Sequence, residues 1–100
     1  MEKFVIAKLF IKTSATADFH HALEALAVVT RKEPGCISYT WYAEPLEAGV
    51  FMLIEHYRDK AGLQHHFRQT YLADFIKKMD TWKIKDPEVH FLSAEPDALK

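Results

Sequence analysis

The stretch CISYTWYAEPLEAGVFMLIEHY, from Cys36 to Tyr57, contains two strand-like segments separated by a turn. Residues 36–44 and 50–57 are rich in β-branched and aromatic side chains, which favour strands. The link between them, 45–49, begins with proline and ends with glycine, a composition typical of turns. Because so short a link cannot carry the chain across a sheet, it predicts an antiparallel hairpin.

Upstream of the hairpin, the sequence predicts a strand followed by a helix. Residues 4–12 are mostly apolar on both alternating faces, which indicates a strand covered on both sides. Apolar side chains recur at helical spacing over 19–30, and residues 13–16 offer hydroxyl groups for the helix N-cap. We expect this helix to end before Pro34 and Gly35.

Downstream of the hairpin, the sequence again predicts helix and then strand. Asp59 is placed to cap a short helix, and 69–70 separate that helix from a second amphipathic helix or a bent continuation. We expect Pro87 to break the chain before a fourth strand at 88–93. The C-terminal tail, 95–100, has little to pack against, and we expect it to be mobile.

The order of elements predicts the fold class. Strand, helix, strand, strand, helix, strand is the βαββαβ arrangement of an α+β, ferredoxin-like domain, which we assign to residues 1–94. Its four-stranded antiparallel sheet carries helices on one face. The other face is too apolar to remain in water, so we expect it to pack on a second copy as a dimeric α+β barrel.

Size, charge and cysteine content exclude several classes of protein. The 100 residues suffice for one domain, and a formal net charge of −1 gives no basis for binding nucleic acid or an anionic membrane. The single cysteine, Cys36, excludes an internal disulfide and fits a reducing compartment. We see no signal peptide and no apolar run of the ~18 residues that span a bilayer, and we expect a cytoplasmic protein.

Two polar side chains are predicted on buried faces. Alternation places Glu55 beside Leu53 and Tyr57, where a carboxylate acts as an acid or base, anchors a histidine, or forms a structural ion pair. Helical spacing places His66 on the inward stripe with Leu63, and His65 towards solvent. A histidine there serves as a base, a proton shuttle or a hydrogen-bond donor, or is simply a core residue with a satisfied ring.

The histidine and glycine patterns predict no metal and no cofactor. Neighbouring residues on a helix point about 100° apart, so neither His20-His21 nor His65-His66 can chelate one ion. No two histidines stand four residues apart. Three glycines in the chain leave no phosphate-binding loop. Cys36 has no nucleophile motif and is interpreted as a small buried apolar residue.

Three segments resemble the antibiotic biosynthesis monooxygenase domain family. RKEPGCISY at 31–39 resembles its helix-to-strand segment, and FMLIEHYRD at 51–59 resembles its third strand. Residues 63–66 are similar to its Ala-Leu-x-x-His element, with Gly62 where the family usually has alanine. The resemblance covers roughly residues 3 to 92. It implies a ferredoxin-like homodimer with a pocket between sheet and helices.

The resemblance also implies an activity and a set of site residues. Several members oxidise quinols or phenols with O₂ and without metal or flavin. His66 is then the base or hydrogen-bond partner, and Glu55 orients it. The substrate-binding residues are the aromatic side chains Tyr39, Trp41, Tyr57, Phe67 and Tyr71, which suit a flat small molecule.

Two other functions remain open for this sequence. A branch similar to autoinducer-2 breakdown proteins isomerises a small phosphorylated carbonyl compound. Asp59 and His66 would serve it, with Arg58 and Lys60 for the phosphate. The third possibility is a non-catalytic dimeric protein that binds a small molecule.

Overall fold

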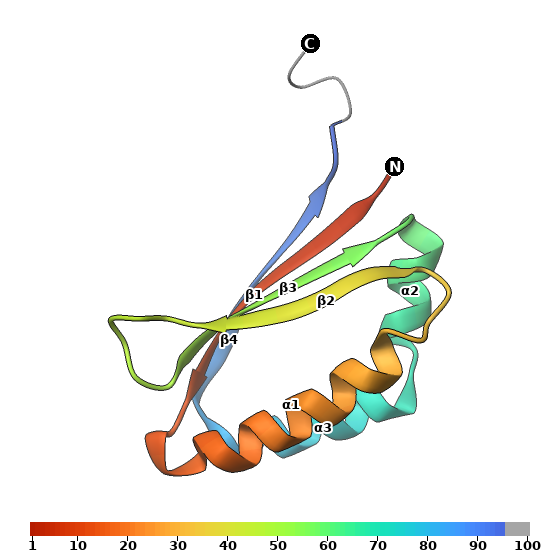
Figure 1. The fold of residues 1–100 in the computed structure, drawn as a ribbon. Coiled ribbons are helices and arrows are strands. Elements are labelled where there is room, and N and C mark those ends of the chain that lie inside the picture. Colours follow the sequence, from red (N-terminus) through yellow and green to blue (C-terminus); the bar gives the residue numbers. More distant parts are fainter. Residues whose placement is uncertain (96–100) are drawn as a thin grey trace.

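The computed structural model describes residues 1–95 and has the predicted α+β, ferredoxin-like fold (Figure 1). Its elements are β1 (Lys3–Ile11), the 3₁₀ turn η1 (Thr13–Ala15), α1 (Thr16–Thr30), β2 (Cys36–Ala43), β3 (Val50–Tyr57), α2 (Lys60–Phe67), α3 (Thr70–Trp82) and β4 (Lys83–Ser93). The predicted tail at 95–100 falls, from residue 96 onwards, outside the described residues.

The four strands form one antiparallel sheet in the order β2-β3-β1-β4. In Figure 1 the helices α1 and α3 lie along one face of this sheet and α2 lies at one end. Cross-strand pairs share a face, and Val5 is paired with Glu55 while Ala7 is paired with Leu53. Since Val5, Ala7 and Leu53 are buried, this is the face towards the helices. The position of Glu55 on that face follows from register alone.

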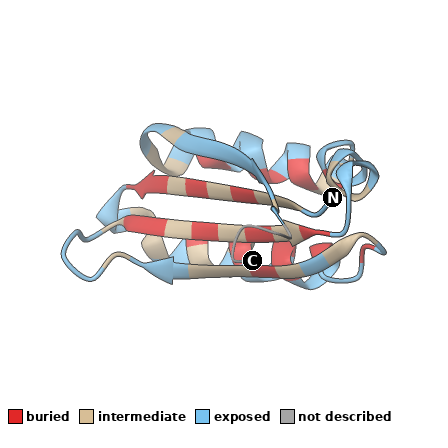
Figure 2. Cartoon of the chain, turned by 90° about the horizontal axis from the view of Figure 1, so that it is seen from above, coloured by how far each residue is buried: buried red, intermediate tan, exposed pale blue. Residues whose placement is uncertain are grey.

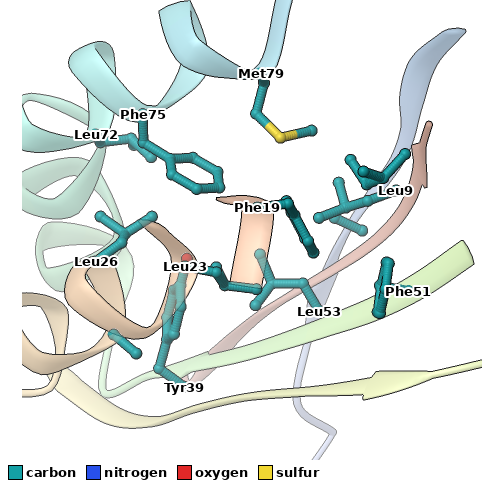
Figure 3. Packing of buried hydrophobic residues seen from close by; sticks show 13 residues of the cluster. Leu9, Phe19, Leu23, Leu26, Tyr39, Phe51, Leu53, Leu72, Phe75 and Met79 are labelled. Atoms are coloured by element: carbon teal, nitrogen blue, oxygen red, sulfur yellow. The ribbon is translucent and has the colours of Figure 1, made fainter. Parts of the chain in front are cut away.

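The hydrophobic core lies between the sheet and the two long helices. Figure 3 shows Leu72, Phe75 and Met79 of α3 directed towards Leu9 and Leu53 of the sheet. Phe19 and Leu23 of α1 are fully buried in the same cluster. Burial in Figure 2 is concentrated along the central strands and on the helix turns facing them. No helix among residues 1–95 is long and apolar enough to span a membrane.

The opposite face of the sheet has no helix over it in the described part of the chain (Figure 1). Phe4, Ile6, Met52 and Ile54 occupy this face and are only partly buried, and Tyr42 of β2 is exposed. An apolar open face was predicted from the strand patterns, and its composition agrees.

The two edge strands, β2 and β4, do not present complete rows of free hydrogen-bonding groups. Pro87 was expected to break the chain, which is wrong, because β4 continues through it from Lys83. Proline lacks an amide hydrogen but is tolerated in an edge strand, and the pairing of β4 with β1 is irregular there. At the other edge, the Arg31 guanidinium donates two hydrogen bonds, of 2.6 and 3.0 Å, to the carbonyl oxygen of Tyr39 in β2.

Two details of the helices also differ from or refine the predictions. No side-chain hydroxyl caps α1, because residues 13–15 form a 3₁₀ turn and Thr16 donates to the Thr13 carbonyl instead. The predicted cap of α2 is confirmed, since the Asp59 carboxylate accepts from the Gly62 amide at 2.8 Å. After Gln69 the chain starts a separate helix, α3, and not a bent continuation.

Candidate active site

Glu55 lies in β3 beneath the helices and is only 5% exposed. The predicted face is confirmed: Glu55 and Tyr57 are both buried on the helix side of the sheet. The Tyr57 hydroxyl donates a hydrogen bond of 2.5 Å to Oε1 of Glu55. A buried carboxylate without such a donor would be strongly destabilising, so this bond helps to hold Glu55 in place.

His66 lies in α2, is 1% exposed, and has a carboxylate near each ring nitrogen. Nδ1 is 3.0 Å from Oε2 of Glu33, and Nε2 is 3.5 Å from Oε1 of Glu55. The rings of Tyr39 and Tyr57 flank the imidazole, with centroids 5.9 and 5.4 Å away. The inward position of His66 is confirmed, as is the exposure of His65.

Glu33 is the residue that sequence reasoning missed. It follows α1 in the turn before β2 and is buried. Its Oε2 accepts a hydrogen bond from the Tyr71 hydroxyl and lies within hydrogen-bond distance of His66 Nδ1, while its Oε1 is buried with no partner among residues 1–95. The only signal was its place before Pro34-Gly35, which marks a turn and says nothing of the direction of the side chain.

A close approach of two backbones holds His66 near Glu33. Gly35, in the turn after Glu33, faces Gly62 of α2, and a Cβ atom on Gly35 would lie 2.5 Å from the Gly62 Cα atom. The Arg58 amide also donates to the Gly35 carbonyl at 2.8 Å. The absence of side chains at both glycines therefore allows α2 to pack directly on the turn.

Burial dominates the electrostatics of this cluster. Desolvation raises the pKa of Glu55, although the Tyr57 hydroxyl and the charge of His66 act in the opposite direction. Burial also raises the pKa of Tyr39, Tyr57 and Tyr71, and for each of them a nearby glutamate adds to the effect. The three phenols are therefore neutral hydroxyl groups at neutral pH. The Cys36 thiol is likewise disfavoured as a thiolate, because burial raises its pKa.

A cavity of about 220 Å³ lies between the sheet and α3. Its walls are mostly apolar, with Leu9, Leu53, Leu72, Phe75, Met79 and Val89 among them. The polar groups in the lining are Tyr39, Glu55, Asp80 and Lys83, of which the last two form a salt bridge of 2.9 Å. Of the two carboxylates beside the His66 ring, Glu55 is the one that lines the cavity.

The structure brings together some of the predicted binding residues and separates others. Tyr39 and Phe67 line the cavity, although Phe67 is 46% exposed and does not share the fully buried position of His66. The other three predicted residues do not line the cavity. Tyr57 is hydrogen-bonded to Glu55, and Trp41 packs against the core with the Arg31 guanidinium 5.9 Å from its ring. Tyr71 lines a groove between α1 and α3.

The residues considered for a phosphate are engaged or remote. Arg58 donates to the Pro34 carbonyl and is exposed, Lys60 is exposed, and Asp59 serves as the helix cap. Within residues 1–95, none of these three side chains is part of the cavity wall. No three histidine, cysteine, aspartate or glutamate side chains within 1–95 are grouped so that they could hold a metal ion.

Comparisons with known proteins identify relatives. A family model described as "Antibiotic biosynthesis monooxygenase" matches residues 4–78. "Putative monooxygenase Rv0793" of Mycobacterium tuberculosis is 36% identical over 62 residues, which are 62% of this chain. An uncharacterised protein of Synechocystis is 29% identical over 85 residues, which are 85% of this chain. The matched segments span 60% and 58% of the length of these two relatives.

Solved structures agree with the sequence matches. The structure of Rv0793 superposes with a TM-score of 0.88 at 24% identity, covering 98% of this chain and 99% of that chain, which shows the fold. A Caulobacter crescentus protein described as a "putative antibiotic biosynthesis monooxygenase" superposes with a TM-score of 0.89 at 27% identity, covering 94% of this chain and 90% of that chain.

Proposed function

This chain belongs to the antibiotic biosynthesis monooxygenase family, and from that premise we propose that it oxidises a small quinol-like or phenolic molecule with O₂ and without a cofactor. The family supports a monooxygenase-type function in general. The substrate class and the direct use of O₂ are our proposals, and they depend on the cavity beside Glu55.

The observation that carries the proposal is an apolar cavity with a buried carboxylate in its wall. Its volume of about 220 Å³ is below the ~300–1,000 Å³ of sites for drug-sized ligands, so it suits a molecule of one or two rings. The apolar walls favour a flat aromatic body. Tyr39 and Glu55 supply a donor and an acceptor for its hydroxyl groups.

In this proposal Glu55 takes the phenolic proton. A general base works best when its pKa lies near the working pH, and burial moves the pKa of Glu55 in that direction. The resulting electron-rich anion reduces O₂ directly. One oxygen atom enters the organic product, the other leaves as water, and the substrate supplies all four electrons. His66 contacts the Glu55 carboxylate and orients it. Glu55 is then the base and His66 the orienting residue, which is the reverse of the roles that the family resemblance suggested.

We also propose that the protein forms a homodimer through the open face of its sheet. The open sheet face is apolar, and a second copy of the same face would remove Phe4, Ile6, Met52 and Ile54 from water. We expect light scattering to give twice the chain mass for the natural protein and the chain mass for Ile54→Lys. The control Val28→Lys, on the exposed side of α1, should stay dimeric. A natural protein with the mass of one chain at micromolar concentration would refute the dimer. The cytoplasmic location stays a prediction.

An oxygen electrode tests the proposed activity. We expect O₂ uptake with at least one of a panel of benzo- and naphthohydroquinones, above the spontaneous rate and without added metal. Glu55→Gln should lower kcat by roughly 10²-fold or more, because general-base catalysis typically contributes that much. Glu24→Gln, which changes an exposed glutamate on α1, is the matched control and should be unchanged.

The same screen separates the alternatives. Turnover of a phosphorylated carbonyl compound under argon would replace the oxidation by an isomerisation. Saturable binding of quinols with no turnover in either gas would leave a ligand-binding protein. Either result would contradict the proposed function.

A further inference from the structure

Four side chains lie in a row between the inner cavity and the outer groove. Glu55 lines the cavity between the sheet and α3, and Tyr71 lines the groove of about 700 Å³ between α1 and α3. Between them stand His66 and Glu33, and Tyr57 donates to Glu55 from the side. We call Glu55, His66, Glu33 and Tyr71 the carboxylate–histidine array.

We propose that this array is a two-way proton relay between the cavity and the outer groove, with Glu33 as its outer carboxylate. Its part in turnover rests on the proposed function, in which Glu55 receives the substrate proton. The relay itself is a property of the array and is testable without any substrate. Glu33, His66 and Tyr71 are positioning residues in this scheme, because they act through Glu55.

The contacts of the array run in the required order. The Tyr71 hydroxyl donates to Oε2 of Glu33, and the same oxygen lies 3.0 Å from Nδ1 of His66. The opposite nitrogen, Nε2, is 3.5 Å from Oε1 of Glu55, a gap that a small side-chain movement closes. A proton that enters at Glu55 therefore meets an acceptor at each successive position.

The number of protons in the array explains why His66 can pass one on. Each ring nitrogen faces a carboxylate oxygen, and a neutral imidazole has a hydrogen on only one of its nitrogens. Both ring nitrogens can be hydrogen-bonded to their carboxylates only when the array holds one more proton, either as an imidazolium ion or as the carboxylic acid of one glutamate. The transfer of that proton from Glu55 to the ring, and from the ring to Glu33, converts one of these protonation states into another.

A purely structural ion pair would not need this arrangement. Burying two carboxylates beside one histidine is expensive, and a single carboxylate would suffice to orient the ring. The second one, Glu33, also keeps an oxygen, Oε1, that is buried and has no partner within residues 1–95. This oxygen is a free acceptor for a proton in transit.

The proton balance of the proposed reaction uses the relay in both directions. The proton taken from the phenol passes from Glu55 to Nε2, while Nδ1 releases its own proton to Glu33. When one atom of O₂ leaves as water, a proton returns along the same path, and the ring regains its first tautomer. The array thus ends each turnover in its starting state.

Other titratable and charged groups lie near the array. Tyr57 of β3 donates to Glu55, and Cys36 and Tyr39 of β2 are close enough for the charges of Glu33, Glu55 and Arg31 to act on their pKa values. The three phenol and thiol groups are neutral near neutral pH, because burial raises the pKa of each. These three groups therefore do not take up the mobile proton, which passes between Glu55, His66 and Glu33 and exchanges with the groove through the Tyr71 hydroxyl.

Nitrogen NMR of the His66 ring tests the relay in the ligand-free protein. We expect Glu33→Gln to leave the ring proton on Nε2, facing Glu55, and Glu55→Gln to leave it on Nδ1, facing Glu33. The ring tautomer should therefore invert between the two variants. The same tautomer in both would overturn the relay, because a ring with a fixed tautomer cannot pass a proton from one nitrogen to the other.

Turnover measurements test the role of the relay in catalysis. With a quinol that the natural protein oxidises, Glu33→Gln and Tyr71→Phe should lower kcat by at least ~10-fold at low buffer concentration, with KM unchanged. Added imidazole buffer should restore most of the rate for Glu33→Gln, since a small base can exchange the proton directly. Glu24→Gln, at an exposed position of α1, is the matched control.

The two experiments fail in different ways. If the natural protein oxidises no quinol, the proposed function is wrong, and the NMR result still decides whether the array transfers protons. If the protein oxidises quinols but Glu33→Gln has the natural kcat at low buffer concentration, the relay is wrong and the oxidation stands. A loss of rate in Glu33→Gln that no buffer restores would also overturn the relay in favour of a structural ion pair.

Discussion

The substitution Gly35→Ala should destabilise the fold and separate α2 from the turn before β2. A Cβ atom at this position would lie 2.5 Å from the Gly62 Cα atom, whereas ordinary contacts are 3.4–4 Å. The two backbones must therefore move apart by about 1 Å, since carbon atoms pack at ~3.5–4.0 Å. Neither atom belongs to a flexible side chain that could turn away, so the strain falls on the backbone.

The size of the effect follows from two opposing terms. Overpacking of this kind costs about 1–3 kcal/mol, and a backbone clash belongs at the upper end. Alanine also stabilises by about 0.4–1 kcal/mol, because it restricts the unfolded chain more than glycine does. The net loss is about 2 kcal/mol. In a domain of this size that lowers Tm by about 8–16 °C.

Thermal unfolding followed by circular dichroism measures the loss, and NMR of the His66 ring reports the local change. A shift of α2 by about 1 Å would break the 3.0 Å contact between Nδ1 and Glu33, since hydrogen bonds of this type rarely exceed ~3.2 Å. Ala61→Ser adds one atom to an exposed neighbour of Gly62 and is the control, with an expected change below about 0.5 kcal/mol. A Gly35→Ala protein with the natural Tm and an unchanged His66 spectrum would refute the reasoning.

Three further predictions concern stability. Burial raises the pKa of Glu55, so protonation of this carboxyl group favours the folded state. The resulting stabilisation is fully present below pH 4.5, the pKa of the group in the unfolded chain, and it is lost as the pH rises through the higher pKa of the folded protein. Urea unfolding at pH 4, 6 and 8 should therefore show the natural protein losing more stability with rising pH than Glu55→Gln, and equal slopes would contradict this. Phe19→Ala removes a fully buried ring and should cost about 3–5 kcal/mol in the same assay, so a loss below 1 kcal/mol would show a core that closes around the gap. Asp59→Ala removes the cap on the Gly62 amide and should cost about 1 kcal/mol, with Asp59→Asn as the variant that keeps most of it.

The fold could be predicted because its signals are local. The short link at 45–49 fixed the hairpin, and alternation placed Glu55 on the helix side before any tertiary contact was known. The strand after Pro87 was shortened in the prediction because proline usually ends a strand, and the sequence does not reveal that β4 is an edge.

The site was only half predictable, for a different reason. Glu55 and His66 have side-chain directions set by strand and helix periodicity, so each could be assigned to a buried face. Glu33 lies in an irregular turn, where no period gives the direction of a side chain, and its contact with His66 spans 33 residues. The close packing of Gly35 on Gly62, which brings the two together, appears in the sequence only as two separate glycines.

The two sheet edges bear on how copies of this protein can assemble. Pro87 interrupts the amide row of β4, and the Arg31 side chain occupies a carbonyl of β2, so each edge offers an incomplete row of donors or acceptors. Strand-by-strand addition, which has no natural end and produces fibres, is disfavoured at both sides. The open face of the sheet is then the surface left for association. Two copies related by a two-fold axis would cover this face on each other, so that no open face would remain for a third copy. In the proposed dimer, growth would stop at that closed particle, and the incomplete edges would oppose polymerisation.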